Sequence, residues 1–255
     1  MSDSHPTMTT SDTMPPVLPA TPETVSGAAV RVQRFVGRHC VATLILGDSE
    51  TMDRIEADAL VTDPPYGTQR SGIFDNERWN GGEQTAKSWT SKSWGEMHND
   101  DKPFDPARWL KYPIVILWGA NYYQDRLPSK RGMLIWDKTG GGIGGAAFKN
   151  DGEIAWTNGT DAVRIFSHLW NGYKRASEIG QHMHPTQKPV ALMAWAMDKA
   201  KIPQGATVLD PYMGSGSTGI ACLRTGRNFI GVERDAAHYK TACDRIAHEL
   251  DGALL

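Results

Sequence analysis

The sequence predicts an α/β fold, an open and mostly parallel sheet with helices packed against it. Short apolar runs, most of them followed by a polar or acidic residue, recur along the chain. Most of these runs are continuous rather than alternating, as expected for strands buried on both faces of a parallel sheet. Helical patterns separate several of them, which is typical of α/β domains that bind ligands at the carboxyl ends of their strands.

Seven apolar runs are predicted to be strands, and three longer segments are predicted to be helices. The strands cover residues 42–46, 59–62, 114–118, 133–136, 153–156, 207–209 and 229–232, and the helices cover 189–201, 217–225 and 236–250. Two stretches, 68–100 and 160–186, show neither pattern. Loops of this length inside a compact domain are usually functional or disordered, so we expect a lid-like loop at 68–100 and a small functional region at about 160–186.

The composition is that of one globular domain in a chain of 255 residues. Residues 1–29 hold mainly Ser, Thr, Pro, Met and a few acids, so we expect a disordered tail followed by a single domain over 30–255. The apolar runs are too short to span a bilayer. Three cysteines without a CxxC pair favour a reducing cytoplasm over a zinc site or a disulfide framework.

A glycine-rich turn follows the predicted strand at 207–209 and opens the next helix. It places Gly214, Gly216 and Gly219 in GxGxxG spacing, which alone is a weak signal for a nucleotide-like ligand. The glycines would let the backbone approach a ligand closely, and Glu233, one strand later, could accept hydrogen bonds from ribose hydroxyls. No lysine follows the glycines, so the turn is not a phosphate-gripping loop. A helix-capping turn without a ligand is the alternative.

Acidic residues at four predicted strand ends favour a cationic ligand; they are Asp48, Asp63, Asp210 and Glu233. NAD would place a pyrophosphate at the helix start, where Asp210 would repel it. S-adenosylmethionine (SAM) carries an ammonium and a sulfonium instead, which Asp210 and Asp63 would attract. The grouping of acids also argues against a turn without a ligand. The sequence therefore favours SAM over NAD.

The segment Asp63-Pro64-Pro65-Tyr66 suits chemistry on an exocyclic amino group. Such a nitrogen is a poor nucleophile because its lone pair is delocalised into the base ring. A carboxylate and a backbone carbonyl that accept both N–H hydrogens would favour the nucleophilic form and stabilise the charge that develops. Proline offers a carbonyl and no competing N–H, and Tyr66 could stack a base rotated out of the duplex. The plainer alternative is a strand that ends in a Pro-Pro turn.

Three motifs resemble those of the amino-methylating DNA methyltransferases. Residues 63–66 resemble their DPPY catalytic motif, and residues 210–216 resemble the cofactor motif DPFxGSG, with Tyr212 in place of Phe. Residues 184–189 are similar to the HPTQKP segment that precedes it. The order of the motifs, catalytic first, is similar to the circularly permuted β class of the family. The likeness runs from about residue 44 to residue 238.

The resemblance implies a seven-stranded SAM-dependent methyltransferase sheet, circularly permuted so that the chain enters at the third strand. It implies methylation of adenine N6 in double-stranded DNA, with the target base flipped out and with Asp63, Pro64, Pro65 and Tyr66 as catalytic residues. Asp63 would also meet the cofactor's ammonium, Asp48 its adenine and Glu233 its ribose. The expected cofactor-binding residues are Asp48, Asp63, Lys188, Asp210, Tyr212, Gly214, Gly216, Ser217, Thr218 and Glu233.

Several other functions are compatible with parts of this pattern. A cytosine-N4 methyltransferase would share the whole constellation, although Ser tends to replace the motif Asp there. A DNA-binding module without catalysis would show an eroded Asp63 or Tyr66, and neither is eroded. No cysteine follows a proline, so the covalent route to cytosine C5 has no candidate nucleophile. An NAD-dependent enzyme is disfavoured by Asp210.

With a net charge of −2, contacts to DNA phosphates must come from a local patch. Region 160–186, the expected target-recognition region, offers Arg164, Lys174 and Arg175. One such patch is short for a duplex site, so we expect either a homodimer that pairs two patches or weak DNA binding. Trp79, Trp89 and Trp94 in loop 68–100 fit either packing or base stacking.

Two further features of the sequence concern ligands near the predicted helix 189–201. Lys188 precedes this helix, where a cation is unfavourable, which favours a ligand or a carboxylate partner for its ammonium. A solvated lysine is the alternative. His182 and His184 have a spacing that metal ligands use, but no acid or cysteine lies nearby. Methyl transfer needs no metal, so these two are interpreted as turn histidines and no metal site is expected.

Overall fold

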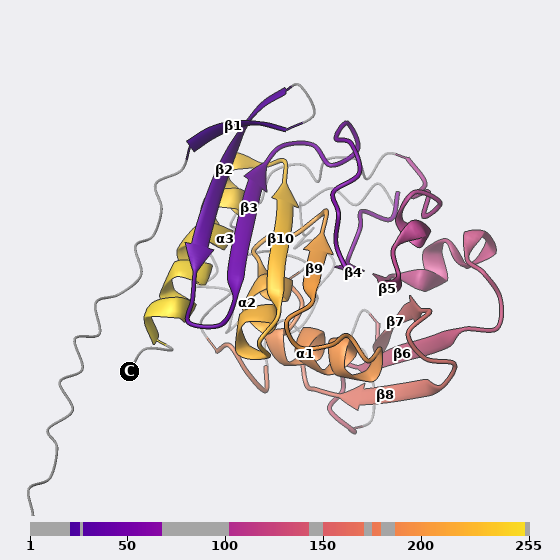
Figure 1. Cartoon of the computed structure of the whole chain (residues 1–255). Coiled ribbons are helices and arrows are strands. Elements are labelled where there is room, and N and C mark those ends of the chain that lie inside the picture. The colour runs from indigo at the N-terminus through magenta and orange to yellow at the C-terminus, as the bar shows by residue number, and fades with distance from the viewer. Residues whose placement is uncertain are drawn as a thin grey trace, which may run out of the picture.

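The computed structural model describes residues 21–25, 28–67, 102–142, 150–170, 175–179 and 187–252, with side chains from Val30 to Asp251 within those ranges. Ten strands form one sheet (Figure 1): β1 Thr21–Val25, β2 Ala28–Val36, β3 Val41–Leu46, β4 Ala59–Thr62, β5 Ile114–Trp118, β6 Gly132–Asp137, β7 Gly152–Thr157, β8 Val163–Ser167, β9 Thr207–Asp210 and β10 Asn228–Glu233. The helices are α1 Val190–Lys199, α2 Ser217–Arg224 and α3 Ala236–Gly252, with 3-10 turns η2 Trp109–Lys111, η3 Ala120–Tyr122 and η4 Gln124–Arg126.

The strand order is β1-β2-β3-β10-β9-β4-β5-β7-β6-β8. The five central strands, from β3 to β5 in this order, run parallel to one another. Strand β7 lies antiparallel between β5 and β6, and β1 and β2 are antiparallel at one edge. The late strands β9 and β10 thus lie between the early strands β3 and β4. This confirms the predicted open, mostly parallel α/β sheet, while the circular permutation stays a prediction.

The sheet has three strands more than the seven expected, and each lies at or near an edge. β1 and the start of β2 fall within residues 1–29, where a disordered tail was expected, because backbone pairing with β2 and β3 orders them. β8 falls within 160–186, where no regular element was expected, because it pairs in parallel with β6. Residues 1–20 and the lid-like loop 68–100 lie outside the described residues.

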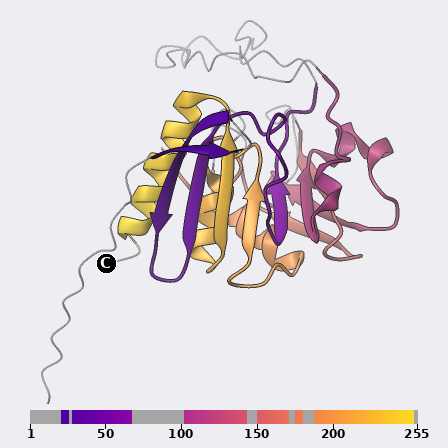
Figure 2. The same cartoon turned by 45° about the horizontal axis from the view of Figure 1, so that its top comes forward.

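Both faces of the central strands are buried, but different elements cover them (Figures 1 and 2). In β5, Ile116 and Trp118 belong to the core that packs under α1, α2 and α3. The alternate residues Val115 and Leu117 pack on the other side, against aromatic residues of the 104–123 segment such as Trp109. This two-sided burial explains why the strand sequences are continuous apolar runs. None of the helices in the described ranges has the length and apolar character that crossing a bilayer requires.

Two valines of the same sheet test this account of burial. Val61 in β4 is fully buried, whereas Val163 in β8 is 61% exposed. We expect Val61→Ala to lower the free energy of unfolding by about 2 kcal/mol, because two buried methyl groups are lost and a small cavity remains. Val163→Ala should change it by less than about 0.5 kcal/mol. Urea denaturation measures both values, and equal losses would contradict the observed arrangement.

Candidate active site

The carboxyl ends of four neighbouring parallel strands bring the predicted acids to one edge of the sheet. Asp48 follows β3, Asp63 follows β4, Asp210 ends β9 and Glu233 ends β10. Backbone and side-chain contacts fix these ends to one another. The Gly47 N–H, just after β3, donates to the carbonyl of Glu233 at the end of the neighbouring strand β10 over 2.9 Å.

Asp210 is the buried link between the β4 end and the start of α2. Its side chain is almost fully buried, and it accepts hydrogen bonds from the hydroxyls of Thr62 and Thr218, each over 2.7 Å. The Tyr212 N–H donates to the same carboxylate over 3.1 Å. Burial raises the pKa of Asp210 to about 6, although the three hydrogen bonds favour the ionised carboxylate and oppose this rise. The residue before Asp63 is thereby fixed to the cofactor-motif turn, through contacts that the sequence alone did not predict.

The glycine turn contains a left-handed residue at the start of α2. Gly216 is the N-cap of α2 and has φ of 81°, a left-handed conformation that glycine adopts without strain. The Gly214 N–H donates to Glu233 Oε2 over 2.9 Å, and the Asp235 N–H donates to Oε1 over 2.7 Å. A carboxylate has about four acceptor positions, so Glu233 retains two for hydroxyl donors. Burial raises the pKa of Glu233 above its ordinary value.

Asp63 is held between a hydroxyl and an ammonium. The Tyr66 hydroxyl donates to Asp63 Oδ1, and Lys188 Nζ forms an ion pair with Oδ2. Lys188 is 6% exposed and also pairs with Glu153 Oε2 over 3.1 Å, while Glu153 Oε1 accepts from Lys138 Nζ over 2.8 Å. The cation before α1 therefore has carboxylate partners, one of the two alternatives that its position predicted.

Lys138, Glu153, Lys188 and Asp63 form a charged row in which each ion pair shares a residue with the next. The ionisation of each member therefore depends on its neighbours. Burial alone would lower the pKa of Lys188, but Asp63 and Glu153 hold that pKa above its ordinary value. Burial would raise the pKa of Glu153, yet Lys188 and Lys138 lower it to about 2. Burial raises the pKa of Asp63, and Lys188 opposes this rise. Glu153 and Lys138 were not predicted from the sequence, and the signal for Glu153 was an acid within a predicted strand.

Tyr66 forms an aromatic pair that the sequence did not predict. Its ring stacks on Tyr122, with centroids 4.6 Å apart and planes 16° from parallel. Gly119, at the end of β5, makes room for this arrangement, because a Cβ there would lie 2.0 Å from the Tyr66 ring. Tyr122 is 38% exposed. The segment 63–66 thus presents an aromatic ring beside the carboxylate of Asp63.

Other cofactor-motif residues are buried in the turn or lie beside it. Ser217 and Thr218 are buried in the first turn of α2, and Tyr212 donates its hydroxyl to Glu50. Tyr212 packs edge-on against Trp109, with centroids 5.8 Å apart. Pro64 is buried and Pro65 is half-buried directly after Asp63.

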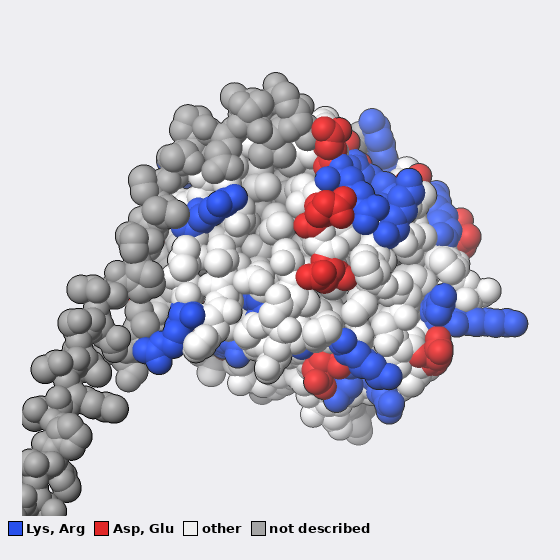
Figure 3. Space-filling model, viewed as in Figure 1, with Lys and Arg blue, Asp and Glu red and all other residues white. Residues whose placement is uncertain are grey.

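The expected DNA-contacting residues are only partly within the described ranges. Arg164 is exposed on β8, but the Arg175 guanidinium lies on the Trp170 ring, 4.1 Å from its centroid, and is partly buried. Lys174, Trp79, Trp89 and Trp94 lie outside the described residues. On the face drawn in Figure 3, basic side chains lie beside acidic ones rather than forming a continuous basic surface.

A metal site is not supported within the described part of the chain. Those residues include no group of three or more His, Cys, Asp or Glu side chains that could hold a metal ion. His182 and His184 lie outside them.

Known proteins match part of this chain. Residues 149–244 match the family model described as DNA methylase. The type II methyltransferase M2.DpnII of Streptococcus pneumoniae is 41% identical over 82 residues, which cover 32% of this chain and 30% of that protein. The putative methylase YubD of Escherichia coli (strain K12) is 40% identical over 68 residues, which cover 27% and 30%. The chain thus matches less than a third of the length of these relatives. The M1.HpyAVI–SAM complex aligns over 80% of this chain and 98% of its own, at 21% identity and a TM-score of 0.49.

The charged row around Lys188 gives a pH-dependent prediction. The pKa of Glu153 is depressed from 4.5 to about 2, so its contribution to stability is complete above about pH 5 and is lost as the pH falls through about 2. Glu153→Gln should therefore lower the free energy of unfolding by on the order of 2 kcal/mol at pH 7, and by progressively less below pH 4.5.

The matched control is Glu56→Gln, because Glu56 pairs with Arg54 on the surface and its side chain is 83% exposed. This variant should change the free energy of unfolding by less than about 0.5 kcal/mol at every pH. Denaturant titrations from pH 3 to 7 provide the comparison. If the effect of Glu153→Gln on the free energy of unfolding did not change with pH, Glu153 would not be stabilised as a carboxylate in the folded protein.

Proposed function

We propose that this chain is a SAM-dependent DNA methyltransferase that modifies N6 of adenine in double-stranded DNA, because residues 149–244 match the family model described as DNA methylase. The observation that carries the proposal is the position of Asp63. This residue directly follows Thr62, whose hydroxyl donates a hydrogen bond to Asp210 at the start of the glycine turn. A carboxylate suited to an amino group and a turn suited to an adenosine ligand are therefore held side by side.

The residues present fit SAM as a cofactor. The acids at the strand ends suit its positive charges, and Glu233 retains acceptor positions for ribose hydroxyls beside the Gly214 N–H. Asp48 accepts the Glu50 N–H over 3.0 Å and lies 3.4 Å from Arg234, at the next strand end. When bound, SAM supplies a methyl group activated by its sulfonium. The protein's own side chains and backbone must bind and orient the target amino group and stabilise the charge that develops on it.

The chemistry of the protein centres on Asp63 and the carbonyl of Pro64. Together they would accept the two N–H hydrogens of the target amino group and so raise the electron density on its nitrogen. Lys188 keeps a positive charge against Asp63, which favours the carboxylate form as the acceptor. As the nitrogen gains a methyl group it becomes positive, and the negative charge of Asp63 stabilises it until its extra proton leaves.

A flipped base would stack on the aromatic pair of the catalytic motif. One face of Tyr66 is covered by Tyr122, so the base would use the other face. The buried Pro64 keeps the chain free of a competing N–H at this point. The Tyr66 hydroxyl donates to Asp63 Oδ1, so the proposed stacking ring and the carboxylate lie next to each other.

Contacts to DNA are proposed for the region 160–186 and for loop 68–100. Arg164 on β8 and Lys174 are the candidates for phosphate contacts, whereas Arg175 is engaged with Trp170. This leaves few phosphate contacts per chain, so a homodimer that pairs two such regions is part of the proposal. Trp79, Trp89 and Trp94 remain proposed base or packing contacts of the lid.

Asp63→Asn tests the proposed mechanism. The amide keeps the shape but can accept through one atom only, so transfer should fall by at least about 100-fold. SAM binding should weaken by no more than about tenfold, because Glu233 and the glycine turn are untouched. Transfer of an isotope-labelled methyl group from SAM to duplex DNA measures the rate. The control is Asp125→Asn, whose side chain is 76% exposed, and it should behave like the wild type. Undiminished transfer by Asp63→Asn would refute the role of Asp63.

The identity of the methylated base is a separate prediction. Asp63 rather than Ser at the head of the motif favours adenine, so nucleoside mass spectrometry of treated DNA should show N6-methyladenine. N4-methylcytosine alone would correct the base and leave the amino-group mechanism standing. Detection of 5-methylcytosine would contradict both, because that reaction needs a nucleophile that Asp63 does not supply.

A further inference from the structure

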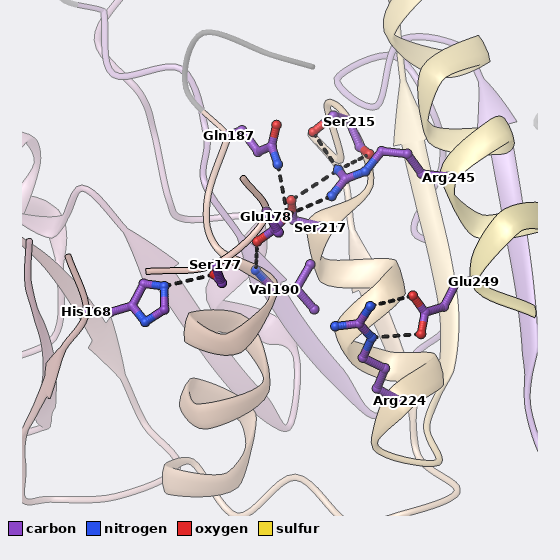
Figure 4. A network of polar contacts seen from close by, with 10 residues as sticks. All are labelled: His168, Ser177, Glu178, Gln187, Val190, Ser215, Ser217, Arg224, Arg245 and Glu249. Atoms are coloured by element: carbon purple, nitrogen blue, oxygen red, sulfur yellow. Dashed lines mark hydrogen bonds and ion pairs between the residues drawn. The ribbon is translucent and has the colours of Figure 1, made fainter. Parts of the chain in front are cut away.

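A buried carboxylate outside the motifs joins three segments of the site. Glu178 precedes α1, and its side chain is 10% exposed. Its Oε1 accepts from Gln187 Nε2 over 2.9 Å and from the Arg245 guanidinium over 3.0 Å (Figure 4). Its Oε2 accepts from the Val190 N–H over 2.9 Å. Glu178 has φ of 53°, in the left-handed region that is unfavourable for a residue other than glycine. This unfavourable backbone is a cost that the three hydrogen bonds offset.

The partner guanidinium of Glu178 reaches the glycine turn. Arg245 projects from α3 and its side chain is 8% exposed. Its Nη1 donates to the Ser215 carbonyl over 2.7 Å, to Ser215 Oγ over 3.0 Å and to Ser217 Oγ over 3.3 Å (Figure 4). These acceptors flank Gly216, whose backbone sets the shape of the turn. The guanidinium therefore ties the turn to Glu178.

The other contacts of Glu178 fix the segment that carries Lys188. The Val190 N–H is at the first residue of α1, where backbone donors have no partner within the helix. Glu178 supplies that partner two residues after Lys188, and it also holds the side chain of Gln187, the residue before Lys188. Lys188 in turn pairs with Asp63.

We propose that Glu178 and Arg245 are positioning residues, which hold the glycine turn and the Lys188–Asp63 pair in one fixed arrangement. This proposal rests on the proposed methyl transfer. Neither residue needs to touch the substrate or the cofactor. Their effect is on the distance between the cofactor turn and the catalytic carboxylate, so both cofactor affinity and turnover depend on them.

The chain offers a matched control in a second Arg–Glu pair. Arg224 of α2 and Glu249 of α3 form two hydrogen bonds of 2.7 and 2.6 Å (Figure 4). This pair also ties α3 to a neighbouring element, but Arg224 is 55% exposed, and its side-chain hydrogen bonds among the described residues go to Glu249 and not to residues 214–217. If Glu178 only stabilised the packing of the helices, loss of its carboxylate and loss of the Glu249 carboxylate should have the same effect on SAM binding and turnover.

The experiment compares Glu178→Gln with Glu249→Gln in the full chain. An amide at 178 must turn its NH₂ toward either the Val190 N–H or Arg245, so one donor faces another. We expect Glu178→Gln to raise the Kd for SAM at least about tenfold and to lower kcat at saturating SAM and DNA by a similar factor. Glu249→Gln should leave both within about twofold. Arg245→Lys keeps the charge and one of the contacts, so its values should fall between those of the wild type and Glu178→Gln.

Calorimetry gives the Kd and labelled methyl transfer gives kcat, with circular dichroism to show that each variant is folded. A folded Glu178→Gln with wild-type Kd and kcat would overturn the proposal, as would equal changes in Glu249→Gln. If Glu178→Gln does not fold, Arg245→Lys decides, because wild-type values in that variant would equally overturn it. A wild-type chain that neither binds SAM nor methylates DNA would instead refute the proposed function.

Discussion

The buried carboxylate of Asp210 is the constraint on which the arrangement of the site depends. It takes one hydroxyl from the end of β4 and one from the start of α2, so the segment that carries Asp63 and the glycine turn cannot move apart without leaving a buried donor unpaired. Its cost is visible in the rise of its pKa to about 6, which comes from burial. A charge held in this way also contributes a negative potential at the strand ends, where a cationic ligand would gain from it.

Compensation of charge explains the rest of the site. Asp63 and Glu153, whose side chains are 16% and 22% exposed, share the ammonium of Lys188, and Glu178 pairs with the guanidinium of Arg245. Removal of one partner from such pairs leaves an uncompensated buried charge, which is more costly than the pair itself is stabilising. The segment from Gln187 to Val190 therefore links both groups. It is held to Asp63 through Lys188 and to the glycine turn through Glu178.

Local patterns predicted most of this fold, and long-range pairing set the remainder. The continuous apolar run Ile114–Trp118 predicted β5 correctly, because both faces of this strand are buried. β8 was missed because Val163 and Ile165 are exposed and only pairing with β6 defines the strand. In the site, the motif residues were recognisable because they are contiguous. Glu178 and Arg245 lie 67 positions apart, so no local pattern could connect them.

If acids at the strand ends select a cationic adenosine cofactor, binding should depend on the charge of the ligand as well as on its shape. Calorimetric titration of the same protein with SAM, S-adenosylhomocysteine and NAD separates charge from shape. S-adenosylhomocysteine keeps the adenosine but lacks the sulfonium, and NAD adds a pyrophosphate. SAM should bind most tightly, S-adenosylhomocysteine more weakly, and NAD much more weakly than either. NAD binding as tight as that of SAM would contradict selection of the cofactor by charge.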